Sequence, residues 1–175
     1  MRRLMLLRHA KSDWSQSGQS DHARGLAARG RKAAPLIGRY MADHALIPDR
    51  AIVSTSVRTR ETWGLVADMF PHNPPADFDD RIYEASPRDI LAALAQAPAA
   101  PRSLLVVGHN PGLHETANLL VESGEPRLRA SLLDKFPTAA LAVIDFDMDA
   151  WADIRPASGH LQCFVTPRAL RAATD

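Results

Sequence analysis

Short apolar runs alternate with segments of helical periodicity along this chain. Three runs, at 4–7, 51–53 and 104–107, consist only of Ala, Val, Ile, Leu and Met. A strand has a continuous apolar run, not an alternating one, when both of its faces are buried, as in a parallel sheet covered by helices. The pattern therefore predicts an α/β fold of three layers, α/β/α, around a mostly parallel sheet.

The helical segments between these runs carry apolar stripes at three- and four-residue spacing. The stripes are Ala33, Leu36, Ile37, Tyr40 and Met41, then Trp63, Val66, Ala67 and Phe70, and finally Leu113, Thr116, Ala117, Leu120 and Val121. We interpret them as core faces. Pro35 lies inside the first stripe, and we expect it to kink that helix or to delay its start, because proline lacks the N–H that a helix interior needs.

Turn signals complete the expected organisation. Ser86 followed by Pro87 is typical of a helix start, and an Ala- and Pro-rich connector follows at 95–102. The runs 139–146 and 151–154 suggest a β-hairpin that adds an antiparallel edge to the sheet. No repeat or break in composition divides the chain, so we expect a single domain over residues 1–175.

Composition sets limits on the class of protein. The 175 residues are 46% hydrophobic and 23% charged, as in one ordinary globular domain. The balance of 21 Lys and Arg against 20 Asp and Glu argues against a nucleic-acid partner. The single cysteine, Cys163, excludes an internal disulfide framework, and no run resembles a signal peptide or a membrane span. We expect a cytoplasmic protein with no membrane partner.

Candidate chemistry stands where the predicted strands end. The first run stops at Arg8 and His9, the third stops at Gly108 and His109, and the second leads into a helical segment that contains Arg58. Ligands of open α/β sheets bind beyond the carboxyl ends of the strands. These side chains are therefore expected to meet at one site.

Two arginines and two histidines suit a phosphoryl group in transfer, whose oxygens carry negative charge. Neutral imidazole is a good nucleophile near pH 7, so His9 is the candidate for attack and for a covalent phosphohistidine. Arg8 and Arg58 are expected to clamp phosphoryl oxygens, and a protonated His109 would add a third positive charge. This chemistry requires neither a metal nor another cofactor.

The same residues resemble a known family, the histidine phosphatase superfamily, whose members are phosphoglycerate mutase-like. The similarity is closest to its short SixA-like branch. The motifs that carry it are Arg8-His9, then Ser54, Arg58 and Thr62, then Asp21-x-x-Arg24-x-Leu26-x-x-x-Gly30, Tyr83-x-Ala85, the segment 107–112, and Thr166-Pro167-Arg168-x-Leu170. Ala10 departs from the glycine that much of the superfamily has there. The resemblance implies a phosphoglycerate mutase-like fold and hydrolysis of phosphohistidine on proteins.

Each of the four central residues also has an ordinary interpretation. His9 could be a loop or capping histidine, and His109 could belong to a strand-to-helix turn whose glycine relieves backbone strain. Arg8 and Arg58 could be surface charges, with Arg60 competing for the role of Arg58. The order of the three motifs along the chain favours the functional interpretation.

Assignments around this centre are more open. Glu84 stands where larger relatives of the superfamily carry a general acid, and its alternative is a surface carboxylate before a helix. Arg24 is the best candidate for a substrate contact in the loop after His9, ahead of Asp13 and Asp21. Solvated loop charge is the alternative for all three.

Other histidines suggest no further chemistry. His114 and Glu115 begin like a zinc protease motif, but Asn118 stands where the second histidine should be. No cluster predicts a metal site, and no glycine-rich motif predicts a nucleotide. His22, His44 and His72 are interpreted as solvated, and His160 as a loop residue.

The substrate is the least defined part of the prediction. The chain has few residues to spare between its elements for a lid, which indicates an open site able to admit a phosphorylated side chain on a protein. A small phosphate ester is the alternative substrate. A phosphate- or phosphoprotein-binding module without turnover is the remaining alternative.

Overall fold

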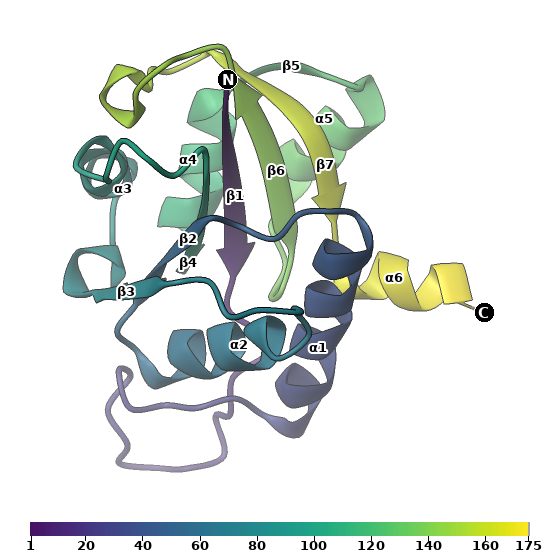
Figure 1. Ribbon diagram of the computed structural model, residues 1–175. Coiled ribbons are helices and arrows are strands. Elements are labelled where there is room, and N and C mark those ends of the chain that lie inside the picture. The colour runs from purple at the N-terminus through teal and green to yellow at the C-terminus, as the bar shows by residue number, and fades with distance from the viewer. Residues whose placement is uncertain (175) are drawn as a thin grey trace.

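A seven-stranded sheet forms the middle layer of the protein, in a computed structural model that describes residues 1–174 (Figure 1). The strand order is β3-β2-β4-β1-β6-β7-β5. The strands are β1 (Arg2–Arg8), β2 (Arg50–Ser54), β3 (Ala76–Asp79), β4 (Ser103–Gly108), β5 (Val121–Gly124), β6 (Leu141–Phe146) and β7 (Gly159–Val165). The three predicted apolar runs are thus the cores of β1, β2 and β4.

Six helices and two short 3₁₀ turns connect the strands. The helices are α1 (Ala28–Asp43), α2 (Val57–Ala67), α3 (Pro87–Ala95), α4 (Gly112–Leu120), α5 (Pro126–Asp134) and α6 (Pro167–Thr174), and the turns are Asp80–Ile82 and Trp151–Asp153. Helix α3 begins as predicted, with Ser86 and Asp89 forming a reciprocal capping box and Pro87 in the first turn. Among residues 1–174, no helix combines the length and the apolar character needed to cross a bilayer.

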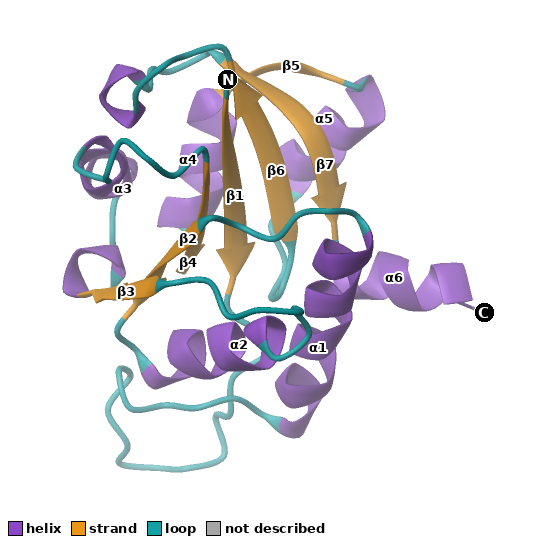
Figure 2. Cartoon of the chain, in the orientation of Figure 1, coloured by secondary structure: helices purple, strands orange, loops and turns teal. Residues whose placement is uncertain are grey.

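Helices cover both faces of the sheet (Figure 2). Met5 and Leu7 of β1 point to a core cluster shared with α1 and α2, whereas Leu4 and Leu6 point to a second cluster shared with α3, α4 and α5. All four side chains are fully buried. The continuous apolar run therefore reflects burial on both faces, and the prediction of a three-layer α/β fold is confirmed.

One strand runs against the others at the centre of the sheet. β6 is antiparallel to both of its neighbours, β1 and β7, and all six of its residues are buried. The predicted hairpin at an antiparallel edge is wrong, because Trp151–Asp153 forms a 3₁₀ turn and the partner strand is β7. The apolar side chain of Trp151 fills the core and does not belong to a strand. Its indole N–H donates to the Pro101 carbonyl at 2.8 Å.

Helix α1 contradicts one of the two alternatives expected from Pro35. The helix runs without interruption from Ala28 to Asp43, so the late start is wrong, whereas the kink stays a prediction. Its apolar face is fully buried at Ile37 and Met41. We attribute the tolerance of proline to this tertiary packing, which supplies most of a helix's stability in a folded protein.

The carboxyl ends of β1, β2, β4 and β7 lie at one edge of the sheet, because these strands are mutually parallel. The segment before β6 closes this edge from the other side. There the Ala139 N–H is within hydrogen-bond distance of the carbonyls of both Arg8 and His9. The end of β1 is thus fixed by backbone bonds.

Gly30 allows α1 to contact the segment that follows β1. A Cβ at this position would lie 2.2 Å from the Lys11 carbonyl oxygen, whereas a Cβ at Gly64, on an exposed face of α2, would meet nothing within 4 Å. We predict that Gly30→Ala lowers the free energy of unfolding by about 1 to 3 kcal/mol. Gly64→Ala should raise it by about 0.5 to 1 kcal/mol through helix propensity alone.

Urea denaturation of the two variants measures both effects. The matched pair separates the steric requirement at Gly30 from the general effect of alanine in a helix. Equal effects of the two substitutions would show that α1 does not depend on this close approach.

Candidate active site

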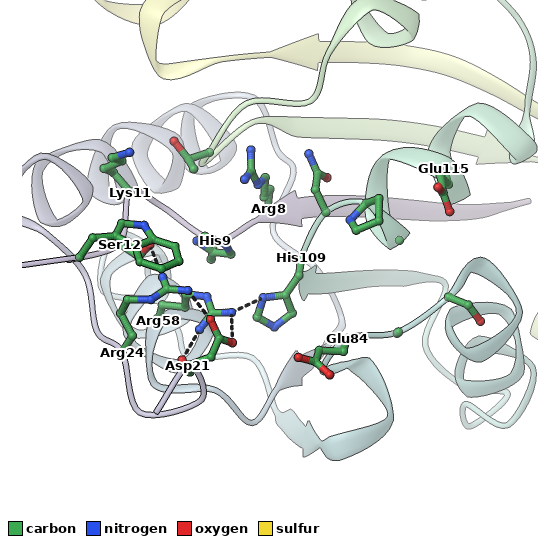
Figure 3. A pocket seen from close by; sticks show the side chains of 17 residues that line it. Arg8, His9, Lys11, Ser12, Asp21, Arg24, Arg58, Glu84, His109 and Glu115 are labelled. Atoms are coloured by element: carbon green, nitrogen blue, oxygen red, sulfur yellow. Dashed lines mark hydrogen bonds and ion pairs between the residues drawn. The ribbon is translucent and has the colours of Figure 1, made fainter. Parts of the chain in front are cut away.

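A pocket of about 650 Å³ opens at the carboxyl edge of the sheet (Figure 3). It contains most of the residues that the sequence singled out. Its walls are formed by Arg8, His9, Lys11, Ser12, Trp14, Asp21, Arg24, Arg58, Glu84, Ala85, Ser86, His109, Asn110, Pro111, Gly112, Glu115 and Thr138. The six residues predicted for catalysis or substrate binding, Arg8, His9, Arg24, Arg58, Glu84 and His109, are all among them.

His9 directly follows β1 and is 7% exposed. Its Nδ1 lies 2.7 Å from the carbonyl oxygen of Ala10. A carbonyl can only accept, so Nδ1 carries the proton and Nε2 keeps its lone pair. Burial, reinforced by the charges of His109, Arg58 and Arg8, lowers the pKa of His9 to about 3. The ring is therefore neutral at pH 7, as a nucleophile must be.

His109 follows β4, and its ring centroid lies 5.4 Å from that of His9. Its Nε2 is 2.7 Å from Ser54 Oγ, and its Nδ1 is 3.3 Å from Nη2 of Arg58. Arginine can only donate, so Nδ1 is the acceptor and Nε2 carries the proton. Burial first, and the charge of Arg58 second, lower the pKa of His109 to about 4.

The expected positive charge on His109 therefore depends on the substrate. Burial and the charge of Arg58 lower the pKa of His109 and keep the ring neutral at pH 7. A dianionic phosphoryl group would reverse the local potential and favour the protonated ring. His109 can then donate from Nδ1, the nitrogen that faces Arg58.

Arg58 and Arg8 supply the fixed positive charge. Arg58 stands in the first turn of α2, behind the N-cap Ser56, and is 5% exposed. Arg8 ends β1 and donates from Nη1 to the Phe136 carbonyl at 3.1 Å. Among the described residues, the Nε atoms of both arginines are buried without a hydrogen-bond partner. Arg60, the competing candidate, contacts the Thr55 carbonyl and the Phe78 ring outside the pocket.

Asp21 holds the charged groups of the pocket together. Its Oδ2 accepts from Arg58 Nη2 at 3.0 Å and from the Tyr83 hydroxyl at 2.5 Å, and its Oδ1 accepts from Arg24 at 2.5 Å. Its backbone carbonyl accepts a further bond from Arg58. The Tyr83 hydroxyl, followed by Arg58, holds the pKa of the Asp21 carboxyl well below its ordinary value. The same bond raises the pKa of Tyr83 to about 12.

This role of Asp21 was not predicted from the sequence, where Asp21 was a weaker candidate than Arg24 for a substrate contact, with a solvated loop charge as the alternative. The available signal was that Asp21, Arg24 and Tyr83 all stand in the motifs quoted for the SixA-like branch. Asp13 does not line the pocket, and within residues 1–174 its side chain accepts only from the nearby Ser15.

Arg24 is buried, so the interpretation as a solvated loop charge is wrong for this residue. It is 8% exposed, and it donates from Nη1 to Ser12 Oγ at 2.6 Å. Its guanidinium lies 3.6 Å from the centroid of the Trp14 ring, which is itself 72% exposed. Arg24 thus links the rim of the pocket to Asp21.

Glu84 lies on the exposed part of the pocket wall, between a 3₁₀ turn and α3. Its backbone has φ +52°, a left-handed conformation that is costly for a side chain with a Cβ. Close by, Gly112 begins α4 so near this segment that a Cβ would lie 1.9 Å from the Ala85 carbonyl oxygen. That glycine serves close packing and not the relief of strain, because its φ is not positive.

Two histidines outside the pocket have structural partners. His114 Nε2 lies 2.6 Å from the Leu132 carbonyl, so this ring connects α4 to α5. His160 lies in β7 and not in a loop, with Nδ1 2.8 Å from Ser123 Oγ. No group of three or more side chains suited to a metal is found within residues 1–174.

Comparison with known proteins agrees with this geometry. The sequence profile of the histidine phosphatase superfamily (branch 1) matches residues 4–90. An uncharacterized protein of Mycobacterium tuberculosis is 31% identical over 164 residues, which span 93% of this chain and 100% of the relative.

Two solved structures assigned as phosphohistidine phosphatase SixA share the fold. The one from Agrobacterium tumefaciens has a TM-score of 0.80 and 31% identity over 95% of this chain and 98% of its own. The one from Nakamurella multipartitia has a TM-score of 0.81 and 29% identity over 95% and 96%. The chain belongs to the histidine phosphatase superfamily, and it is a phosphatase with a phosphoglycerate mutase-like fold.

The ring protonation of the two histidines can be measured directly. We predict that the ¹⁵N signals of His9 and His109 keep a neutral pattern from about pH 8 down to about pH 5, since burial and Arg58 lower both pKa values. His9 should show a protonated Nδ1, and His109 a protonated Nε2. Titration of either ring near its ordinary value of 6.5 would contradict this electrostatic description.

Proposed function

We propose that this phosphatase removes phosphoryl groups from phosphohistidine on proteins through a covalent intermediate on His9. The observation that carries the proposal is the orientation and hydrogen bonding of the His9 ring. Its Nδ1 is committed to the Ala10 carbonyl, and no described residue bonds to its Nε2. The free lone pair lies in a pocket that also presents Arg8, Arg58 and His109.

The first step transfers the phosphoryl group to the enzyme. His9 Nε2 forms a bond to phosphorus while the bond from phosphorus to the substrate's imidazole nitrogen breaks. A proton from water or a neighbouring acid binds the departing nitrogen, so that the ring leaves as neutral imidazole and not as imidazolate. Arg8 and Arg58 stabilise the equatorial oxygens of the transition state, and a protonated His109 assists them.

The second step restores the enzyme. Water attacks phosphorus, the bond from phosphorus to His9 Nε2 breaks, and inorganic phosphate leaves. His9 returns to its neutral form with Nδ1 still bonded to Ala10. The fixed Nδ1–H therefore keeps Nε2 aimed at phosphorus throughout the cycle.

The shape of the pocket supports a phosphorylated side chain on a protein as substrate. Trp14 and Glu84 stand exposed at the pocket. The segment that carries Glu84, between β3 and α3, is short, whereas residues 9–27 form a long loop between β1 and α1. An open pocket of this kind can receive a side chain that projects from a large molecule. The two SixA structures with this fold are of proteins named as phosphohistidine phosphatases, which supports the same substrate class. We place this activity in the cytoplasm, where the lone cysteine Cys163 would remain a thiol.

A competition panel tests the proposed substrate. We expect a phosphohistidine-bearing protein to show a higher kcat/KM than a phosphoserine peptide or small phosphate esters. His9→Ala should reduce every activity by about 1,000-fold or more and should prevent trapping of ³²P on the enzyme. His72→Ala, at an exposed position, is the control. Preference for a sugar or nucleotide phosphate at low concentration would favour a small-metabolite phosphatase instead.

A variant of Glu84 distinguishes the two substrate classes, because their leaving groups differ in how much they need a proton from a general acid. An alkoxide needs a proton to leave, so Glu84→Gln should slow alkyl phosphate hydrolysis by about 100-fold or more if Glu84 is the general acid. Phosphohistidine hydrolysis should change little, because imidazole leaves more easily. Glu115→Gln, which changes another carboxylate of the pocket wall, is the control. A uniform loss in folded Glu84→Gln would assign Glu84 to the organisation of the site.

A further inference from the structure

A second groove, of about 240 Å³, lies beside the active site at the same edge of the sheet. It shares Lys11 and Thr138 with the catalytic pocket, so the two hollows are contiguous. Its walls are Lys11, Arg29, Ala33, Lys135, Pro137, Thr138, Thr166, Pro167, Arg168 and Arg171. Five of these residues are Lys or Arg, and no described wall residue is Asp or Glu.

Separate elements place the five cations. Lys11 follows β1, Arg29 stands in the first turn of α1, and Lys135 comes directly after α5. Arg168 and Arg171 are three residues apart on α6, which places them on one face of that helix. Helix α6 reaches this edge because β7, which is separated from β1 by β6, runs in the same direction as β1 and ends at the same edge.

These five cations form no ion pair or side-chain hydrogen bond that would stabilise the fold of residues 1–174. All five side chains are exposed. By contrast, Arg3, Arg50 and Arg81 are paired with carboxylates. The chain as a whole has a net charge of only +1, so the concentration of positive charge is local.

We propose that this groove binds an acidic segment of the phosphoprotein substrate while its phosphohistidine occupies the catalytic pocket. The proposal rests on the function proposed above. Clustered Lys and Arg without acidic neighbours attract carboxylates and steer association. A substrate with Asp or Glu near its phosphohistidine can contact both hollows at once, which a small phosphate ester cannot.

Two phosphohistidine peptides test the groove directly. They are identical except that one carries glutamates beside the phosphohistidine and the other carries glutamines. With the unaltered enzyme, we expect KM for the glutamate peptide to be lower by about 10-fold at low salt, with a similar kcat. Salt should remove most of this advantage, because exposed charges are screened.

Charge reversal identifies the residues responsible. The double variant Arg168→Glu/Arg171→Glu should lose the preference for the glutamate peptide and keep its activity on an aryl phosphate. The matched control is Arg127→Glu/Arg155→Glu, which reverses the same charge at exposed positions outside both hollows. Lys135→Glu acts from a different element, so it tests the groove even if the double variant frays α6.

The outcomes separate this proposal from the proposed function. If both peptides are hydrolysed equally and the variants change nothing, the groove is not a docking site, although phosphohistidine remains the substrate. If neither peptide is hydrolysed while the aryl phosphate is, the proposed substrate fails and the groove proposal falls with it. A single-stranded oligonucleotide that binds His9→Ala protein more tightly than the glutamate peptide would also overturn it.

Discussion

Repulsion between positive groups is the constraint on which this active site depends. Arg8 and Arg58 are largely buried beside two imidazoles, and nothing in the sheet itself neutralises them. Asp21 is the carboxylate that ties Arg58 in place, and it does so from a loop far away in sequence. The site thus keeps positive charge for an incoming phosphoryl group while one carboxylate fixes the geometry of the guanidinium.

Burial, with the same repulsion as a smaller contribution, decides which form of histidine the site contains. Both disfavour imidazolium, so His9 is held as a neutral ring, the form that the proposed nucleophile needs. Electrostatics alone would leave the tautomer open. The Ala10 carbonyl settles it, because its hydrogen bond requires the proton on Nδ1. Burial, charge and backbone geometry together leave the Nε2 lone pair free for the proposed attack before any substrate arrives.

Much of this arrangement was predictable from the sequence because it follows the ends of buried strands. Continuous apolar runs located β1, β2 and β4, and parallel strands bring their carboxyl ends together, which placed Arg8, His9 and His109 at one edge. The partner of β6 was not predictable in this way. Apolar residues at 151–154 look the same whether they form a strand or fill a core, and only the tertiary structure distinguishes the two.

The features that could not be predicted from the sequence are those determined by contacts between loops. Asp21 joins its near neighbour Arg24 to Arg58 and Tyr83, which are 37 and 62 residues away, and no local pattern encodes partners so distant along the chain. The left-handed backbone of Glu84 is likewise invisible in its residue type, which gives no reason to expect φ +52°. The sheet edge therefore fixes the groups that handle phosphate, whereas the loops decide how those groups are oriented and what approaches them. Differences in substrate among proteins of this fold should arise mainly in such loops, because the strand ends leave little freedom to vary.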